Sequence, residues 1–321
     1  MKGTEFEETP MTMLYNLAVL GAMAAVMVSA PSCAERHHDG SFGGDTKHVD
    51  KTFAVAAGGA LKLRVDAGNV RVKASDGNSV VLSVDIRGRA RDVERFDVNT
   101  SQSGNDVEVR GEFRNKGGWN NTENFDANWV LTVPKEYRVE VETAGGDVEV
   151  VGTTGDVRGG TSGGNVRVSD IRGAVRLETS GGDVQAENIA GKVDLSTSGG
   201  SVKAKSIVGD AKLETSGGDV SADNVDGDVQ AETSGGNVYV KLTSVNKGVH
   251  AETSGGNIEL VVSKSIGADV DLSTSGGEVV CDIPVTVQGK IAEDEVRGKL
   301  NGGGQRLFAH TSGGNVHLRA N

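Results

Sequence analysis

The side chains best placed to do chemistry in this sequence are oxygen ligands that recur beside paired glycines. Asp147, Asp183 and Asp219 each follow a Gly-Gly pair and lie four residues after a threonine. A row of carboxylates is a candidate Ca²⁺ site, because that ion takes about six to eight oxygen ligands. Asn165 and Ser201 occupy the intervening positions and dilute the charge. The repeat of about nine residues typical of calcium-binding β-rolls is also missing. Turn chemistry is the favoured explanation, and no cofactor is expected.

A second recurring row consists of glutamates that each precede a threonine: Glu142, Glu178, Glu214, Glu232 and Glu252. We expect a solvated face that keeps the protein soluble, with attraction of cations or of a basic partner as the alternative. Two of the six histidines, His310 and His317, flank the final Gly-Gly pair and are expected to approach one another. Without a nucleophile or a third ligand, such a pair predicts neither catalysis nor a metal site.

The sequence favours a protein that is not an enzyme. Right-handed β-helix polysaccharide lyases and hydrolases are the enzymatic alternative, and they need paired carboxylates or calcium-held acids in a cleft. The formal net charge of −12 argues against nucleic acid as a partner, since affinity for it comes from clustered Lys and Arg.

All these side chains hold fixed places in a repeat. The segment Thr-Ser-Gly-Gly, or Thr-Ala-Gly-Gly where it first occurs, begins at Thr143, Thr161, Thr179, Thr197, Thr215, Thr233, Thr253, Thr274 and Thr311. The spacing is 18 residues five times and then 20, 21 and 37. Such periodicity is typical of a solenoid, and the last gap is interpreted as two coils, one of them degenerate and carrying an insertion.

Apolar residues alternate on both sides of each glycine pair, as in Val175/Leu177 and Val184/Ala186. Period two predicts two short strands per coil, each with one face inward. We therefore predict an all-β, right-handed parallel β-solenoid or β-helix with coils of about 18 residues. Val184, Val202 and Val220 are expected to be buried, and the threonines to bond one another along the stack.

Two glycine-containing corners join the strands of each coil. Ile171, Ile189, Ile207 and Val225 are expected to fill the core at the second corner. Glycine, Asn and Asp suit corners because they tolerate positive φ. The structural glycines of the first corner are Gly163, Gly164, Gly181, Gly182, Gly199, Gly200, Gly217, Gly218, Gly235 and Gly236.

Four regions are expected along the chain. Residues 1–34 form a signal peptide, because Met11–Ala30 is free of charge and small residues precede a cleavage point after Ala34. A retained membrane anchor and lipidation at Cys33 are the alternatives, so membrane contact is expected only through this segment. Residues 35–49 form a flexible tether, residues 50–138 an irregular N-terminal solenoid section that holds most of the aromatic residues, and residues 139–321 the regular solenoid. The protein is then exported to the periplasm, the cell surface or the medium.

Cys281 is expected to be a buried, inert core thiol, because alanine, valine or leucine fills the equivalent position elsewhere. No capping helix follows the coil that ends at Asn321, so homo-oligomers formed by edge pairing are expected as an option.

The glycine corners flanked by Val-x-Val, and the closing stretch Val296–Gly304 before His310–Val316, resemble the bacterial "putative adhesin" family of unknown-function domains. The resemblance covers about residues 50–321. It implies a β-solenoid on exported or envelope proteins, and it carries over no catalytic residue. The function that we expect is adhesin-like binding of an envelope or host glycan or protein through the elongated surface. A structural or regulatory envelope module is the other alternative.

Overall fold

The structure is a computed structural model that describes residues 38–39, 44–114, 124–243, 246–287 and 292–321. The chain divides into two compact units, Met1–Ser32 and Cys33–Asn321, and every described residue lies in the second. The predicted export signal and Cys33 lie outside the described residues. Within the described part, no helix has the length and apolar character needed to cross a bilayer.

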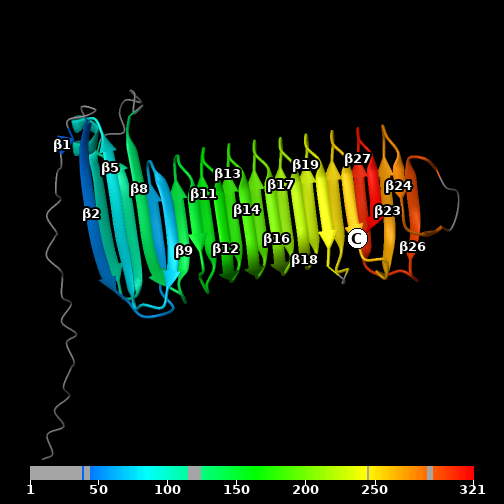
Figure 1. Ribbon diagram of the computed structural model, residues 1–321, viewed down its shortest axis with the longest axis horizontal. Coiled ribbons are helices and arrows are strands. Elements are labelled where there is room, and N and C mark those ends of the chain that lie inside the picture. Colours follow the sequence, from blue (N-terminus) through cyan, green and yellow to red (C-terminus); the bar gives the residue numbers. More distant parts are fainter. Residues whose placement is uncertain (1–37, 40–43, 115–123, 244–245, 288–291) are drawn as a thin grey trace, which may run out of the picture. The chain divides into compact units, whose positions relative to one another are not determined.

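Two long, mostly parallel sheets make up the described residues of the second unit (Figure 1). In spatial order, sheet A contains β1 (His38–Asp39), β2 (Gly44–Ala54), β5 (Ser79–Gly88), β8 (Asp126–Pro134), β4 (Asn69–Ser75), β10 (Val148–Val151), β12 (Val166–Arg172), β14 (Val184–Ala190), β16 (Val202–Val208), β18 (Val220–Asp226), β20 (Val238–Leu242), β22 (Ile258–Val262), β28 (Val316–Ala320) and β24 (Val279–Cys281). Sheet B contains β25 (Thr286–Val287), β26 (Glu295–Leu300), β23 (Ala268–Thr274), β27 (Arg306–Thr311), β21 (Val249–Thr253), β19 (Val229–Thr233), β17 (Ala211–Thr215), β15 (Val193–Thr197), β13 (Val175–Thr179), β11 (Val157–Thr161), β9 (Arg138–Thr143), β3 (Ala60–Val65), β7 (Asp106–Phe113) and β6 (Phe96–Ser103). One short helix, α1 (Ala90–Arg95), joins β5 to β6.

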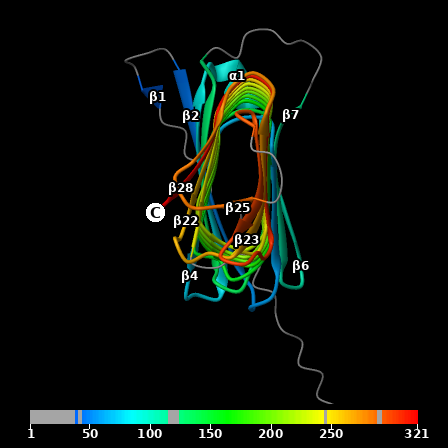
Figure 2. The ribbon, with the colours of Figure 1, turned by 90° about the vertical axis from the view of Figure 1, so that its right-hand side faces the viewer.

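Each regular coil contributes one strand to each sheet, and the sheets face one another across a hydrophobic core (Figure 2). Every residue pairs with its equivalent one coil away, so Val202 lies between Val184 and Val220. These three valines are 0–1% exposed. Full burial of each such side chain contributes about 1.5–3 kcal/mol, which offsets the entropy of ordering the coil. The predicted β-solenoid and its valine column are confirmed.

The second corner of each coil is built as the sequence suggests. Asn188 and Asn224 take positive φ angles of 56° and 58°, which their short polar side chains tolerate. Ile189 and Ile207, directly after this turn of the chain, are 1% exposed and fill the core there, as expected.

The chain does not enter the solenoid in sequence order. The coil of β3 and β4 lies between the coil of β9 and β10 and an outer coil of β7 and β8. Antiparallel strands β5 and β2 then extend sheet A, and antiparallel β6 extends sheet B. The wider interior of this end is filled by rings, with the Phe96 centroid 4.9 Å from those of Phe113 and Phe125 and 6.1 Å from that of Trp129.

The expected tether is wrong for its final residues. Strand β2 begins at Gly44 and pairs with β5 over ten residues, because Val49 and Phe53 pack against the core. Lys47 and Lys51 cross from β2 to the Phe96 carbonyl oxygen, at 3.0 Å, and the Thr100 hydroxyl, at 2.8 Å. Charged side chains directed across an edge in this way block pairing with another chain.

The opposite end also departs from sequence order. Strands β27 and β28 do not follow β23 and β24 in space but lie between them and β21 and β22. Figure 1 shows these red strands between yellow and orange ones. The coil that ends at Asn321 is therefore internal, and β25 and β26 cover the edge of sheet B. The expectation that this coil would offer a free edge for pairing is wrong, because the insertion in the gap of 37 residues lets β27 and β28 return to the inner side of β23 and β24.

Candidate binding surface

The threonine column lies inside the solenoid and is structural. Thr215 is 8% exposed, and its hydroxyl donates to the carbonyl oxygen of Gly200 in the preceding coil at 2.8 Å. Thr233 repeats this bond to Gly218, also at 2.8 Å. The expectation that threonines bond one another is wrong, because these hydroxyls donate to glycine carbonyl oxygens of the preceding coil instead. The column is therefore no exposed ligand surface.

The first corner requires glycine pairs for a reason other than the expected tolerance of positive φ. None of the ten predicted glycines has φ in the left-handed region. The second glycine of each pair instead stacks against its equivalent, so that a Cβ on Gly218 would lie 2.2 Å from the Gly200 oxygen. The first glycine is less confined, since a Cβ on Gly217 would lie 3.2 Å from the Gly199 oxygen.

The candidate calcium ligands form a ladder of backbone caps. The Asp219 Oδ1 accepts a hydrogen bond from the Asn237 backbone N–H at 2.7 Å, and Asp147 and Asp183 accept equivalent bonds at 2.8 Å and 2.7 Å. The row runs along the first corner, but the coils of Asn165 and Ser201 lie between the carboxylates, so that successive carboxylates are two coils apart. Among the described residues, no group of three or more His, Cys, Asp or Glu side chains is arranged to hold a metal ion.

The glutamate row lies on the outer face of sheet B, beside a shallow groove along the first corner. Glu214 pairs with Lys212 at 2.8 Å. Farther along, the Nε2 of His250 lies 3.4 Å from Glu252 and 3.9 Å from Glu232. These three side chains are 42–44% exposed. The row is a mixed-charge surface, and its groove is lined by Glu214, Thr215, Glu232, Thr233, Ser234, Glu252, Thr253, Ser254, His310 and Ser312.

The groove leads to an aromatic stack that the sequence did not suggest. The Phe308 ring lies 4.7 Å from the His250 ring at an interplanar angle of 10°, and the Arg306 guanidinium lies 4.6 Å from the Phe308 centroid. Arg306 and Arg297 both pair with Asp271. Burial raises the pKa of Asp271, but the hydrogen bonds from Arg306 and Arg297 outweigh it and lower that pKa overall. Only coil order brings Phe308 beside His250, so the stack could not be found from spacing.

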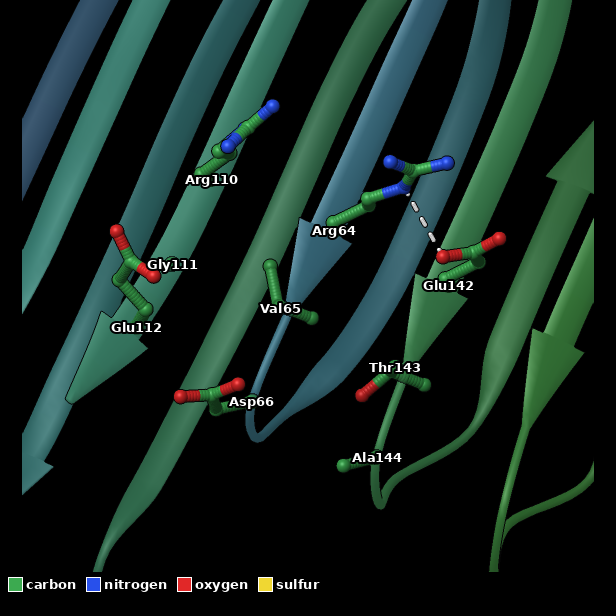
Figure 3. A pocket seen from close by; sticks show the side chains of 9 residues that line it. All are labelled: Arg64, Val65, Asp66, Arg110, Gly111, Glu112, Glu142, Thr143 and Ala144. Atoms are coloured by element: carbon green, nitrogen blue, oxygen red, sulfur yellow. Dashed lines mark ion pairs between the residues drawn. The ribbon is translucent and has the colours of Figure 1, made fainter. Parts of the chain in front are cut away.

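A second shallow groove lies at the other end of the same face (Figure 3). Figure 3 shows Arg64 directed toward Glu142, with an Nε-to-carboxylate distance of 3.0 Å. Arg64 also contacts Glu140 at 3.2 Å. Asp66, directly after β3, accepts the Phe113 backbone N–H at 3.1 Å. Acid and base alternate here, as they do around His250.

The expected approach of His310 and His317 is wrong. His310 lies on β27 in sheet B, where its Nδ1 is 2.9 Å from the Ser273 hydroxyl. His317 lies on β28 in sheet A, where its Nε2 is 2.8 Å from Asp282. The positions are outward on opposite sheets, so a corner separates them rather than joining them.

His48 belongs to a polar cluster that was not expected, because residues 35–49 were interpreted as a flexible tether. Its Nδ1 lies 2.7 Å from Asp85 and its Nε2 lies 2.8 Å from Asp50. The hydrogen bond with Asp85, followed by that with Asp50, raises the pKa of His48. The sequence signal for this cluster was the spacing of His48 and Asp50, two residues apart, which places both on one face of a strand.

Cys281 is half-buried rather than buried. It lies on β24, the last strand of sheet A, so it has a neighbouring coil on one side only. Burial, and then the charge of Asp282, raises the pKa of this thiol to about 11.

Comparison with known proteins identifies the family. A model described as Toastrack DUF4097 matches residues 59–319. Among solved structures, the chain is similar to a "putative adhesin" from Bacteroides fragilis NCTC 9343, with a TM-score of 0.40 and 15% identity over 85% of this chain and 97% of that one. It is also similar to a "putative lipid binding protein" from Parabacteroides distasonis ATCC 8503, with a TM-score of 0.42 and 15% identity over 88% of this chain and 98% of that one. A "putative adhesin" from Parabacteroides merdae ATCC 43184 gives a TM-score of 0.32 and 12% identity over 84% and 95% of the two chains. None of the curated proteins matches. Since the family model spans most of the sequence, the chain belongs to the Toastrack DUF4097 family.

Proposed function

We propose that this chain is an exported, non-enzymatic envelope or surface protein that binds a glycan or protein, as an adhesin does, through the outer face of sheet B. One observation carries the proposal. Charged and aromatic side chains from successive coils line up there in rows, from Arg64 and Glu142 to Glu252 and Phe308. Inward positions of the same strands are aliphatic or threonine.

The spacing of these rows suits a repetitive partner. Adjacent strands lie about 4.8 Å apart, so equivalent donors and acceptors recur at that interval along the face. Contacts that are individually weak then add by multivalency. Mixed charge favours a partner with both hydrogen-bond donors and acceptors, such as a glycan or a polar protein surface, over one with a single strong charge.

A paired substitution tests the face. Full-length chain carrying Glu232→Gln and Glu252→Gln would be compared with chain carrying Glu187→Gln and Glu259→Gln, which lie on the outer face of sheet A. Both would be applied to an array of envelope and host glycans and to affinity capture from envelope extract. We expect saturable binding by the unaltered chain, at least about tenfold weaker binding by the first variant and little change in the second.

Three results would contradict the proposal. Absence of saturable binding on the array and in the extract would remove the binding function itself. Shortened polysaccharide products after incubation with the unaltered chain would favour the enzymatic alternative instead. Equal loss in both variants would contradict the choice of sheet B.

A further inference from the structure

The coil of β27 and β28 occupies a slot made by residues that precede it in the sequence. Its strands form parallel ladders with β21 and β22 on one side and with β23 and β24 on the other. The flanks of the slot are therefore residues 249–262 and 268–281. Both flanks are complete before residues 306–320 are needed.

The contacts that hold the coil in this slot are those of the repeat. Thr311 donates to the Gly256 carbonyl oxygen at 2.7 Å, and the Asn315 backbone N–H donates to Asn257 Oδ1 at 2.8 Å. On the other side, Thr274 donates to the Gly314 carbonyl oxygen at 2.6 Å. The inward side chains are all 0% exposed: Leu307, Ala309, Val316 and Leu318. Main-chain bonds and small aliphatic side chains thus provide the fit, and the same coil from another molecule would make all of them.

A glycine-rich crossover connects β26 to β27 around β23. It contains Asn301, Gly302 and Gly303 with φ angles of 45°, 90° and 96°. The Asn301 amide donates to the Ile266 carbonyl oxygen at 2.8 Å, and the Asn246 amide donates to that of Gln305 at 2.7 Å. A few side-chain bonds therefore fix a segment whose backbone has wide conformational freedom.

We propose that this slot accepts residues 306–320 of a second copy of the chain, so that two copies exchange the coil reciprocally. The crossover of residues 301–305 is the hinge that opens. Strand insertion of this kind uses ladder hydrogen bonds for affinity and alternate side-chain pockets for register. Exchange adds no new interface type, since each slot is filled by the same sequence as before. The inference does not depend on the proposed function.

Shortening the hinge tests the exchange. Leu300 and Arg306 flank β23, so the crossover spans two strand spacings, about 9.6 Å, and must also pass around Gly267. Deleting Gly302, Gly303 and Gly304 leaves two residues between Leu300 and Arg306. The three Cα–Cα steps that remain reach about 10 Å when fully extended. This length leaves nothing for the path around Gly267, so the chain's own coil can no longer reach its slot. We expect the shortened full-length chain to have twice the mass of one chain in light scattering, with unchanged circular dichroism. The matched control duplicates the three glycines, and we expect it to keep the mass of the unaltered chain.

A folded, monomeric shortened chain would overturn the proposal. If the shortened chain does not fold, a second measurement decides. Unaltered full-length chain, warmed close to its unfolding midpoint, would be mixed with a labelled peptide of residues 304–321. We expect incorporation of up to one peptide per chain. The same peptide with Gly314→Val should not enter, because a Cβ at this position lies 2.1 Å from the Gly256 oxygen. Failure of the unaltered peptide to incorporate, or equal entry of both peptides, would overturn the proposal.

Discussion

The hydroxyl of Thr215 donates a hydrogen bond to the carbonyl oxygen of Gly200, 2.8 Å away in the preceding coil. The same oxygen would clash with any side chain on the stacked Gly218. Threonine and glycine are thus two halves of one contact between coils. Their recurrence in every coil explains why the repeat keeps both residue types.

Removing one hydroxyl should destabilise the solenoid. Thr215→Val keeps the shape of the side chain but leaves the Gly200 carbonyl oxygen without this donor, at a cost of about 1–2 kcal/mol in the free energy of unfolding. Thr215→Ser keeps the hydroxyl and should cost less. Urea denaturation measures the difference, and Ser216→Ala at the neighbouring exposed position is the control, expected within about 0.5 kcal/mol of the unaltered chain. Equal stability of the Val variant and the control would contradict the role of the bond.

Adjacent glycines should differ sharply in their tolerance of alanine. Gly218→Ala places a Cβ 2.2 Å from a backbone oxygen, so the coils must separate, and we expect a loss of about 3 kcal/mol or more. Gly217→Ala leaves 3.2 Å and should cost under about 1 kcal/mol. Thermal unfolding of the two variants side by side provides the measurement. Similar losses would show that flexibility, not space, selects glycine.

The row that contains Asp219 should respond to loss of its oxygen and not to loss of its charge. Asp219→Asn retains an Oδ1 that accepts the Asn237 N–H, so unfolding in urea should change by less than about 0.5 kcal/mol. Asp219→Ala removes the acceptor and should cost about 1 kcal/mol. Stabilisation of the unaltered chain by Ca²⁺, lost in Asp219→Asn, would instead support a cation site.

The His48 cluster predicts a modest pH dependence. The raised pKa of His48 means that its contribution is present below 6.5 and is lost as pH rises through the higher folded-state value. The hydrogen bond with His48 lowers the pKa of Asp50, whose contribution is present above 3.8 and is lost as pH falls through its lower folded-state value. His48→Gln should therefore destabilise most near pH 5 and hardly at all near pH 9. The side chains are 44–59% exposed, so the effect should stay under about 1 kcal/mol. A variant curve parallel to that of the unaltered chain from pH 4 to 9 would contradict it.

Cys281 should be slow to react in the folded protein. With its pKa near 11, on the order of a hundredfold less thiolate is present at pH 8 than in an ordinary cysteine. In a chain with Cys33→Ser, labelling by a thiol reagent should accelerate by a similar factor when denaturant is added. Rapid labelling of the native chain would show that its half-burial leaves the sulfur accessible.

The regular half of the fold could be predicted because its information is local. Leu177 and Val184 alternate with polar residues on either side of a glycine pair, and they are 1% and 0% exposed. A fixed period then sets the register of the whole stack. The partners of the inward threonines could not be predicted, since the sequence does not show which acceptor lies closest across the coil boundary.

The two ends could not be predicted because their pairings join residues far apart in the chain. Spacing alone does not show that β5 pairs antiparallel with β8, or that Leu307 lies between Val249 and Val270. The surface features that depend on this order were missed with it, including the stack of His250 on Phe308. The spacings of 20, 21 and 37 residues were the one signal that regular winding stops there.

The enclosed positions of residues 60–75 and 306–320 restrict how members of this family can differ in length. Each of these coils is bounded on both sides by chain from elsewhere, so extra turns cannot be appended at the outside without dismantling a closure. Whole 18-residue units can be added or removed most simply among residues 157–226, where successive coils pair in the same register. The middle of the solenoid is therefore the part that tolerates insertion or loss of a coil, whereas its two ends do not.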